Sequence, residues 1–256
     1  MSYKKKGAKV TVLLPVYNEN INYLKDAITS LLKQTFKIWK CFIIFEGNNQ
    51  ENLKYINEIL NKDDRFKLII PSGKSGLASS LNVGLENSET EYIARFDSDD
   101  IMHHDRLRYQ LLFLEKNKHI SVVGSNLIII NKKGKRIGKR NYPESGGKLN
   151  FYFSYKCGLA HPSTMFRLED VKAIGMYNSK LSKAEDLDLW LRMLKKGFKF
   201  FNIQKPLVFF RHKSNFRPKS HWKFVLKVRK ANSGTFNFFQ ERFIFFAYWI
   251  ICKFTK

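Results

Sequence analysis

The chain has 256 residues, 44% of them hydrophobic, and a formal net charge of +24. The hydrophobic share excludes a disordered chain, and the length allows one large domain or a domain with an appendage. A charge of this size predicts a polyanionic neighbour, which could be nucleic acid, an anionic membrane surface or a phosphorylated substrate.

Three cysteines, Cys41, Cys157 and Cys252, are scattered along the chain without a CxxC spacing. This pattern favours neither a disulfide framework nor a thiolate zinc site, and it fits a reducing compartment best. The amino terminus carries no apolar signal segment, and no window approaches the roughly 20 apolar residues of a membrane span. We therefore expect the body of the protein in the cytoplasm.

Predicted strands and helices alternate along the first hundred residues. A continuous apolar run predicts a buried strand at 10–14, and further strands are expected at 41–45, 66–70 and 92–96. Helices are expected between them at about 24–32, 53–60 and 76–85, the first because its apolar residues recur at helical spacing. This alternation predicts an α/β fold with a mainly parallel sheet and right-handed crossovers.

Polar residues follow three of these strands, at 15–19, 46–48 and 97–100. Ligands of open α/β sheets bind beyond the carboxyl ends of the strands, so the three segments are expected to form one crevice that fits a nucleotide. The dinucleotide fingerprint GxGxxG is absent. The segment 73–75 does not form a P-loop, because the glycine required five residues earlier is Leu68.

Three carboxylates, Asp97, Asp99 and Asp100, lie within four residues at the end of the strand at 92–96. Acids this close repel one another, so the pattern favours a divalent cation with oxygen ligands, Mn²⁺ or Mg²⁺. The alternative is a solvated turn in which Asp100 caps a helix that begins near His104. His103 and His104 are adjacent, without metal-ligand spacing, and are expected on the surface.

A further helix is predicted from residue 185, because Leu187, Trp190, Leu191 and Leu194 form an apolar stripe at i, i+3, i+4 and i+7. Glu185 and Asp186 would then lie in its first turn. There they could act chemically or simply complement the helix dipole.

Six segments share an order and spacing with a known family: 10–19 (VTVLLPVYNE), 76–78 (GLA), 93–100 (IARFDSDD), 160–167 (AHPSTMFR), 174–177 (IGMY) and 184–192 (AEDLDLWLR). Over roughly residues 9–216 the chain resembles the family 2 glycosyltransferases. The resemblance implies a GT-A fold, which is Rossmann-like with helices flanking a mainly parallel sheet. It also implies a nucleotide-sugar donor, a divalent metal and an inverting transfer, as in enzymes that assemble bacterial surface polysaccharides.

The resemblance also implies roles on the donor side. Asp99 matches the principal metal ligand of the DXD motif, Asp97 matches an acid that faces the ribose or the metal, and Asp100 would lie behind them. Arg211-His212 matches a segment that approaches the metal or the diphosphate, which makes His212 a further metal-ligand candidate. The nucleotide-sugar side is expected to comprise Pro15, Tyr17, Glu19, Glu46, Arg95 and Asp97.

Two of these donor-side positions leave alternatives open. Tyr17 could be ordinary core packing. Relatives commonly carry Asp-Asp-Gly-Ser where this chain has Phe-Glu-Gly-Asn at 45–48, so one carboxylate remains to read a uracil base. Glu46 could reach that base with its extra methylene, and a UDP-sugar is favoured as the donor.

On the acceptor side, the resemblance makes Asp186 the general base that deprotonates the acceptor hydroxyl, with Glu185 beside it. A base for a single displacement must face the diphosphate across the anomeric carbon, so it should come from a different part of the chain than the metal ligands. His161, Trp190 and Arg192 match positions around the acceptor. Trp190 could equally be core, and His161 a satisfied loop histidine.

The family likeness ends near residue 217. We expect a catalytic domain at 1–217, with a nucleotide-sugar-binding half at 1–100 and an acceptor-binding half at 101–217, followed by a basic, aromatic helical tail at 218–256. The segment 211–230 carries eight Lys/Arg and no acid. An uncharged aromatic run at 243–252 is too short to span a bilayer but suits its interface. The alternative is a tail that packs on the catalytic domain.

These features together predict a metal-dependent inverting glycosyltransferase, peripheral on the inner face of the cytoplasmic membrane. By resemblance, it would extend lipopolysaccharide, lipooligosaccharide or capsular glycan on a lipid-linked acceptor beside an anionic membrane surface. The rival hypothesis is a nucleic-acid-binding protein without catalysis, based on the charge and on interleaved aromatics such as Trp222 and Phe224. It leaves the acids unexplained, and no nucleic-acid partner is expected.

Overall fold

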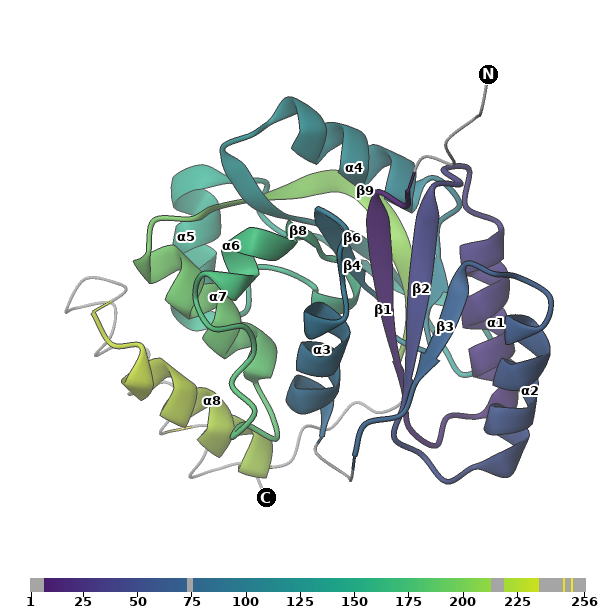
Figure 1. Cartoon of the computed structure of the whole chain (residues 1–256). Helices are drawn as coiled ribbons and strands as arrows, with labels where there is room; N and C mark the ends of the chain where they lie inside the picture. The colour runs from purple at the N-terminus through teal and green to yellow at the C-terminus, as the bar shows by residue number, and fades with distance from the viewer. Residues whose placement is uncertain (1–6, 73–75, 213–218, 235–245, 247–249, 251–256) are drawn as a thin grey trace.

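The computed structural model describes residues 7–72, 76–212, 219–234, 246 and 250 (Figure 1). A nine-stranded sheet has the order β3-β2-β1-β4-β8-β6-β9-β5, with β7 paired to β6. Helices lie on both sides of this sheet (Figure 1).

The first half confirms the predicted alternation of strands and helices. Its strands are all parallel to their neighbours: β1 (Val10–Val16), β2 (Trp39–Phe45), β3 (Phe66–Ile69) and β4 (Tyr92–Arg95). The helices between them are α1 (Ile21–Leu32), α2 (Gln50–Leu60) and α3 (Leu77–Glu86). Successive residues of a strand face opposite sides. Accordingly, Val12 belongs to the core cluster that contains residues of α1 and α2, and Leu13 to the cluster that contains residues of α3.

The second half is mixed rather than mainly parallel. It comprises β5 (Ile101–Met102), α4 (Arg106–Lys116), β6 (Ile120–Ile130), β7 (Arg136–Arg140), α5 (Gly146–Tyr155), a 3-10 turn (His161–Ser163), β8 (Met165–Arg167), α6 (Leu168–Lys172), α7 (Glu185–Lys195) and β9 (Lys199–Arg211). Strand β8 runs antiparallel to both β4 and β6, whereas β6 and β9 are parallel. Strands β4, β6 and β9 therefore point toward the same edge of the sheet.

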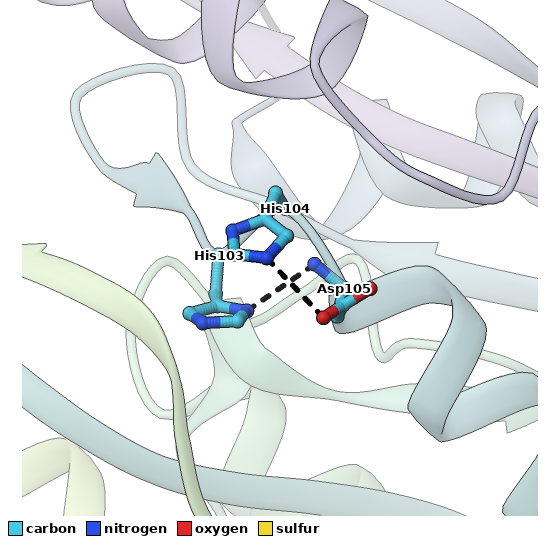
Figure 2. A group of neighbouring side chains, drawn as sticks. All are labelled: His103, His104 and Asp105. Atoms are coloured by element: carbon cyan, nitrogen blue, oxygen red, sulfur yellow. Dashed lines mark hydrogen bonds and ion pairs between the residues drawn. The ribbon is translucent and has the colours of Figure 1, made fainter.

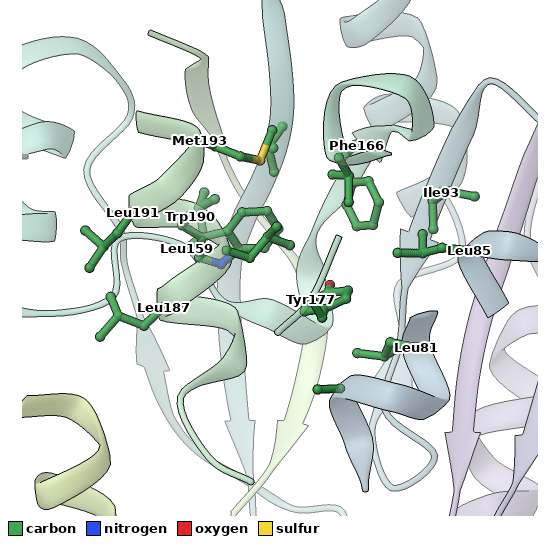
Figure 3. Packing of buried hydrophobic residues seen from close by; sticks show 14 of the residues in the cluster. Leu81, Leu85, Ile93, Leu159, Phe166, Tyr177, Leu187, Trp190, Leu191 and Met193 are labelled. Atoms are coloured by element: carbon green, nitrogen blue, oxygen red, sulfur yellow. The ribbon is translucent and has the colours of Figure 1, made fainter. Parts of the chain in front are cut away.

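The core of the second half centres on Trp190, which is fully buried (Figure 3). Its ring packs edge-on against Phe166 of β8 and Phe200 of β9, with centroids 6.2 and 5.9 Å apart. The predicted apolar stripe of α7 is confirmed, because Leu187 and Leu191 belong to the same cluster. This packing fixes α7 and therefore the acids of its first turn.

The first part of the predicted tail packs on the rest of the protein. Helix α8 (Lys219–Ala231) buries Val225 and Val228 in the cluster that also contains Trp190. Arg229 Nη1 donates hydrogen bonds of 2.9 Å to Phe153 O and Ser154 O, which lie at the carboxyl end of α5. For residues 219–234 the alternative of a tail that packs on the domain is therefore correct.

The other tail predictions have mixed outcomes. Lys223, Lys227 and Lys230 are exposed on one face of α8, as the spacing predicts. Most of the aromatic run 243–252 lies outside the described residues. In the part of the chain that the structure describes, no helix has the length and hydropathy to cross a membrane.

Candidate active site

The segments that follow β1 and β2 lie against each other at the carboxyl edge of the sheet. Asn18 Oδ1 accepts a hydrogen bond of 3.1 Å from the backbone N of Asn48. A Cβ on Gly47 would stand 1.7 Å from the carbonyl oxygen of Tyr17, so only glycine allows this approach. Tyr17 is 52% exposed, and its alternative as a core residue is wrong.

Other expected donor-side residues adjoin the same edge. Asn52 Nδ2 donates a 2.9 Å hydrogen bond to Glu19 O, which ties the first loop to α2. Ser80 of α3 donates a hydrogen bond to a carboxylate oxygen of half-buried Glu46. Pro15 pairs with Ile44 inside the sheet. The carboxylate of Glu46 is therefore held in place from α3.

The three acids after β4 gather as the sequence predicts. One carboxylate oxygen from each of Asp97, Asp99 and Asp100 lies within 4.8 Å of the others. Asp100 is fully buried before β5, and its Oδ1 accepts a 2.8 Å hydrogen bond from Arg211 N. The helix-capping alternative for Asp100 is wrong, because Asp105 occupies the N-cap of α4.

The chemistry of this cluster fits a divalent cation. Within the described structure, Asp100 Oδ2 is buried without a hydrogen-bond partner. Burial, followed by the charges of Asp97 and Asp99, raises the pKa of Asp100 well above its ordinary value. Three close carboxylates, two of them half-buried and one buried, supply the oxygen ligands that Mg²⁺ and Mn²⁺ prefer. Asp99 and Asp97 would hold such an ion, with Asp100 behind them.

Arg95 and His212, both expected on the donor side, make contacts that the sequence did not predict. The Arg95 side chain is only 4% exposed, and its Nη1 lies 2.5 Å from Asp97 Oδ1. Arg95 thus supports Asp97 from inside the protein. His212 is not part of the described group of ligating atoms around Asp99, and its backbone N donates to Ile130 O at 2.8 Å.

Arg211 joins the acid cluster to two other parts of the chain. Its Nε donates to Asp99 O at 2.8 Å, and its Nη2 pairs with Asp26 of α1 at 2.9 Å. Its Nη1 donates to Lys132 O, in the turn between β6 and β7, at 3.1 Å. The sequence pattern marked Arg211 only as the neighbour of His212, because these three partners are 79 to 185 residues away.

The second acidic motif lies at the start of α7, as predicted. Ala184, the residue before the helix, has a left-handed φ of 61°, a strained value for a residue other than glycine. Asp186 Oδ1 accepts a 2.8 Å hydrogen bond from Leu187 N, and Cys157 Sγ lies 3.8 Å from its Oδ2. Burial, followed by the charge of Asp186, raises the pKa of Glu185 to about 7.

A buried polar pair lies next to Glu185. His161 Nε2 is 2.8 Å from Tyr177 OH, and His161 Nδ1 is 4.0 Å from Glu185 Oε1. Burial holds the pKa of His161 well below its ordinary value, so the imidazole is neutral at pH 7. Tyr177 also exchanges two backbone hydrogen bonds with the Asn82 side chain of α3, at 2.8 and 2.9 Å. Sequence reasoning placed Tyr177 in a family motif but gave it no role.

The remaining acceptor-side candidates serve the fold. The core alternative for Trp190 is correct, and its ring packs edge-on against His161 with centroids 6.2 Å apart. Arg192 donates to Ile174 O and Met176 O at 2.7 Å, and it pairs with Asp188 at 2.8 Å. Arg192 therefore shapes the loop that carries Tyr177.

His103, His104 and Asp105 form a second cluster of possible ligands, contrary to the expectation drawn from their adjacency (Figure 2). Their ligating atoms lie within 4.8 Å of one another. However, Asp105 Oδ1 already accepts from Thr35 Oγ1 at 2.7 Å and from Arg108 Nε at 3.2 Å. His103 Nδ1 accepts from Asp105 N at 3.2 Å. These contacts satisfy the cluster locally, and we assign it no function.

Comparison with known proteins connects this geometry to a family. Residues 11–175 match the profile described as glycosyl transferase family 2. EpsE of Bacillus subtilis, described as a putative glycosyltransferase, is 32% identical over 207 residues, which cover 78% of this chain and 72% of EpsE. An uncharacterized glycosyltransferase of Methanocaldococcus jannaschii is 31% identical over 205 residues, with 79% and 70% covered.

Solved structures agree with the fold. The structure of S. aureus TarS 1–349 in complex with UDP-GlcNAc aligns with a TM-score of 0.69 at 17% identity, covering 94% of this chain and 71% of that one. The alignment with the longer TarS chain covers 39% of that chain. At this identity the likeness shows the fold alone. The family profile covers more than half of the chain, which therefore belongs to glycosyl transferase family 2 and is a glycosyltransferase with a GT-A fold.

Proposed function

We propose that this glycosyltransferase transfers a sugar from a UDP-sugar to a growing bacterial surface glycan, with inversion and with help from a divalent metal. The observation that carries the proposal is the presence of two acidic sites, contributed by distant parts of the chain. One is the cluster of Asp97, Asp99 and Asp100 after β4, and the other is Asp186 at the start of α7.

On the donor side, Asp99 and Asp97 would bind the metal, and Arg95 would keep the Asp97 carboxylate in place through their 2.5 Å ion pair. When bound, the ion would neutralise charge that develops on the leaving diphosphate, so no proton donor is needed there. Exposed Tyr17, in the segment that also contains Pro15 and Glu19, would lie against the nucleoside.

On the acceptor side, Asp186 would take the proton of the acceptor hydroxyl as the new bond forms. Because the pKa of Glu185 is raised to about 7, Glu185 is largely protonated below that pH, and we assign the role of general base to Asp186. His161 is buried, so we assign it a supporting role behind Glu185 instead of a direct acceptor contact.

The choice of UDP rests on Glu46. Its carboxylate is held by Ser80 near the loop of Tyr17, where it could read the edge of a uracil base. Structures of TarS, which has a similar fold, are described in complex with UDP and with UDP-GlcNAc.

A calorimetric titration tests the role of Glu46. Glu46→Ala should weaken UDP binding about tenfold, because one hydrogen bond to a charged group is lost. Glu58→Ala, an exposed carboxylate of α2, is the control; unchanged UDP affinity in Glu46→Ala would disprove the base-reading role.

For the acceptor we propose a lipid-linked lipopolysaccharide, lipooligosaccharide or capsular glycan at the inner face of the cytoplasmic membrane. The relative EpsE is described only as a putative glycosyltransferase, so the support comes from the charge and from the aromatic run at 243–252. Flotation with anionic liposomes tests the membrane contact. The full chain should float more strongly than a chain ending at Gly234, which lacks the aromatic run; equal flotation would remove the role of that run.

The decisive experiment is a donor screen. UDP-, GDP-, dTDP- and CMP-sugars are incubated with Mn²⁺ or Mg²⁺ and candidate acceptors, and nucleotide release and glycan mass are followed. Asp99→Ala and Asp186→Ala should each abolish transfer, whereas Asp64→Ala, an exposed acid before β3, should not. Turnover with a donor other than UDP would correct the nucleotide. No turnover with any donor, together with tight binding of nucleic acid, would favour the non-catalytic alternative.

A further inference from the structure

The hairpin formed by the β6–β7 turn and β7, residues 131–140, concentrates positive charge. We call it the basic hairpin. No acidic residue occurs between positions 131 and 143. Six of its side chains are cationic and all six are exposed: Lys132, Lys133, Lys135, Arg136, Lys139 and Arg140. The charge excess of the chain is therefore not confined to its carboxyl-terminal part.

The turn of the basic hairpin lies at the same edge of the sheet as the catalytic acids. Strand β7 pairs antiparallel to β6, so the turn follows the carboxyl end of β6, beside the end of β9. Buried Arg211 connects the two features, because its Nη1 donates to Lys132 O and its Nε donates to Asp99 O. A Cβ built on Gly134, in the same turn, would stand 3.9 Å from Arg211 Nη1. The Arg211 side chain therefore holds the turn next to the segment that carries the acids.

Protection of an edge strand explains only part of this charge. Lysine and arginine on an exposed edge prevent pairing with other chains, which would account for the cations of β7 itself. It does not account for Lys132, Lys133 and Lys135, which precede the strand in a turn anchored beside the acids. That placement suits a role at the crevice.

We propose that the basic hairpin docks an acceptor glycan that carries phosphate or carboxylate groups. This inference rests on the proposed function and adds the chemical class of its acceptor. A single exposed ion pair contributes little, since water and salt screen it. Several cations on one rigid ribbon act together on a repeating anion, and their summed field also steers it toward the crevice.

The test measures binding of a probe by fluorescence anisotropy. The full chain is titrated into fluorescein-labelled dextran phosphate, with unmodified dextran of the same length for comparison. Lys132→Gln/Lys133→Gln/Lys135→Gln should raise the Kd for dextran phosphate at least about tenfold and flatten its dependence on salt. The matched control, Lys116→Gln/Lys118→Gln/Lys195→Gln, removes the same charge from exposed lysines at or near the opposite edge, where β6 begins. It should change the Kd less than about twofold.

Three outcomes would overturn the inference. An equal loss of affinity in both triple variants would mean that dextran phosphate senses only the net charge. Displacement of the probe by UDP would assign the basic hairpin to the donor diphosphate. Loss of binding to phosphatidylglycerol vesicles in the hairpin variant, with unchanged affinity for dextran phosphate, would assign it to lipid.

UDP binding by calorimetry on the same protein separates this inference from the proposed function. A chain that binds dextran phosphate through the basic hairpin but not UDP would contradict the proposed donor and leave the docking surface standing. A chain that binds UDP but shows no preference for phosphorylated over plain dextran would contradict the docking surface alone.

Discussion

Glu185 is a buried carboxylate beside a second acid, and this position makes its ionisation costly. Its pKa rises from 4.5 to about 7 on folding. The folded protein therefore retains a proton that the unfolded chain releases between these values, so the free energy of unfolding falls as pH rises from about 4.5 to 7. Glu185→Gln resembles the protonated form and should remove this loss.

Urea denaturation at pH 5 and pH 8, with EDTA present, tests this prediction. The variant should be more stable than the wild type by less than about 1 kcal/mol at pH 5, and by up to about 3 kcal/mol at pH 8. Glu58→Gln, an exposed residue of α2, should follow the wild type at both pH values. A variant no more stable than wild type at pH 8 would show that Glu185 ionises at an ordinary pKa.

Tyr177 supports buried His161, beside Glu185, through its hydroxyl group. That hydroxyl lies 2.8 Å from His161 Nε2 in a buried setting, so Tyr177→Phe leaves the ring nitrogen without its partner. Thermal or urea unfolding should show a loss of about 1–3 kcal/mol. Tyr109→Phe is the control. Tyr109 is a half-buried residue of α4, and its substitution should change the free energy of unfolding by less than about 0.5 kcal/mol. An equal loss of stability in both variants would show that the His161–Tyr177 contact does not stabilise the protein.

The sequence predicted the parts of the site that depend on short-range pattern. Asp97, Asp99 and Asp100 gather because a strand delivers them together, and Asp186 lies in a first helical turn because the apolar stripe after it is regular. Contacts between residues that are far apart in the chain could not be predicted from the sequence. The distances from His161 to Tyr177 and from Arg211 to the 131–135 turn depend on how loops meet in three dimensions.

At the scale of elements, the close approach of the β1 and β2 loops depends on Gly47. Gly47→Ala would place a methyl carbon 1.7 Å from Tyr17 O, so one of the two loops must shift. We expect a loss of several kcal/mol of stability, about 2–4, together with weaker UDP binding. Gly147→Ala is the matched control, because its Cβ meets nothing within 4 Å in the first turn of α5. Unfolding of both variants by urea gives the comparison, and equal stability would contradict the close approach.

The accuracy of the fold prediction varied with the length of the elements. Strands β1, β2 and β4 are mostly apolar runs in a βα alternation, so their order and parallel pairing followed from the sequence. Strand β8 has three residues and β5 has two, too few for any periodicity. Their antiparallel pairing arises from tertiary contacts with β4, β6 and β9, which no local pattern encodes.

For the whole molecule, the basic residues after position 210 combine two properties. One face of α8 presents Lys223, Lys227 and Lys230 to solvent, while Val225 and Val228 enter the same core cluster as Trp190. Arg229 donates to the carbonyls that end α5, so a cation satisfies helix acceptors that have no partner within the helix. A structural boundary at residue 217 would therefore cut through a packed unit.

Truncation tests this boundary. A chain ending at Gly234 retains α8 and should unfold in urea at nearly the wild-type midpoint. A chain ending at residue 217 loses two buried valines and the Arg229 contacts, which should cost about 3–6 kcal/mol. Within the full chain, Arg229→Gln should destabilise by about 1–3 kcal/mol, whereas exposed Lys230→Gln should not. Equal midpoints for the two truncated chains would show that α8 is an appendage, as the sequence first predicted.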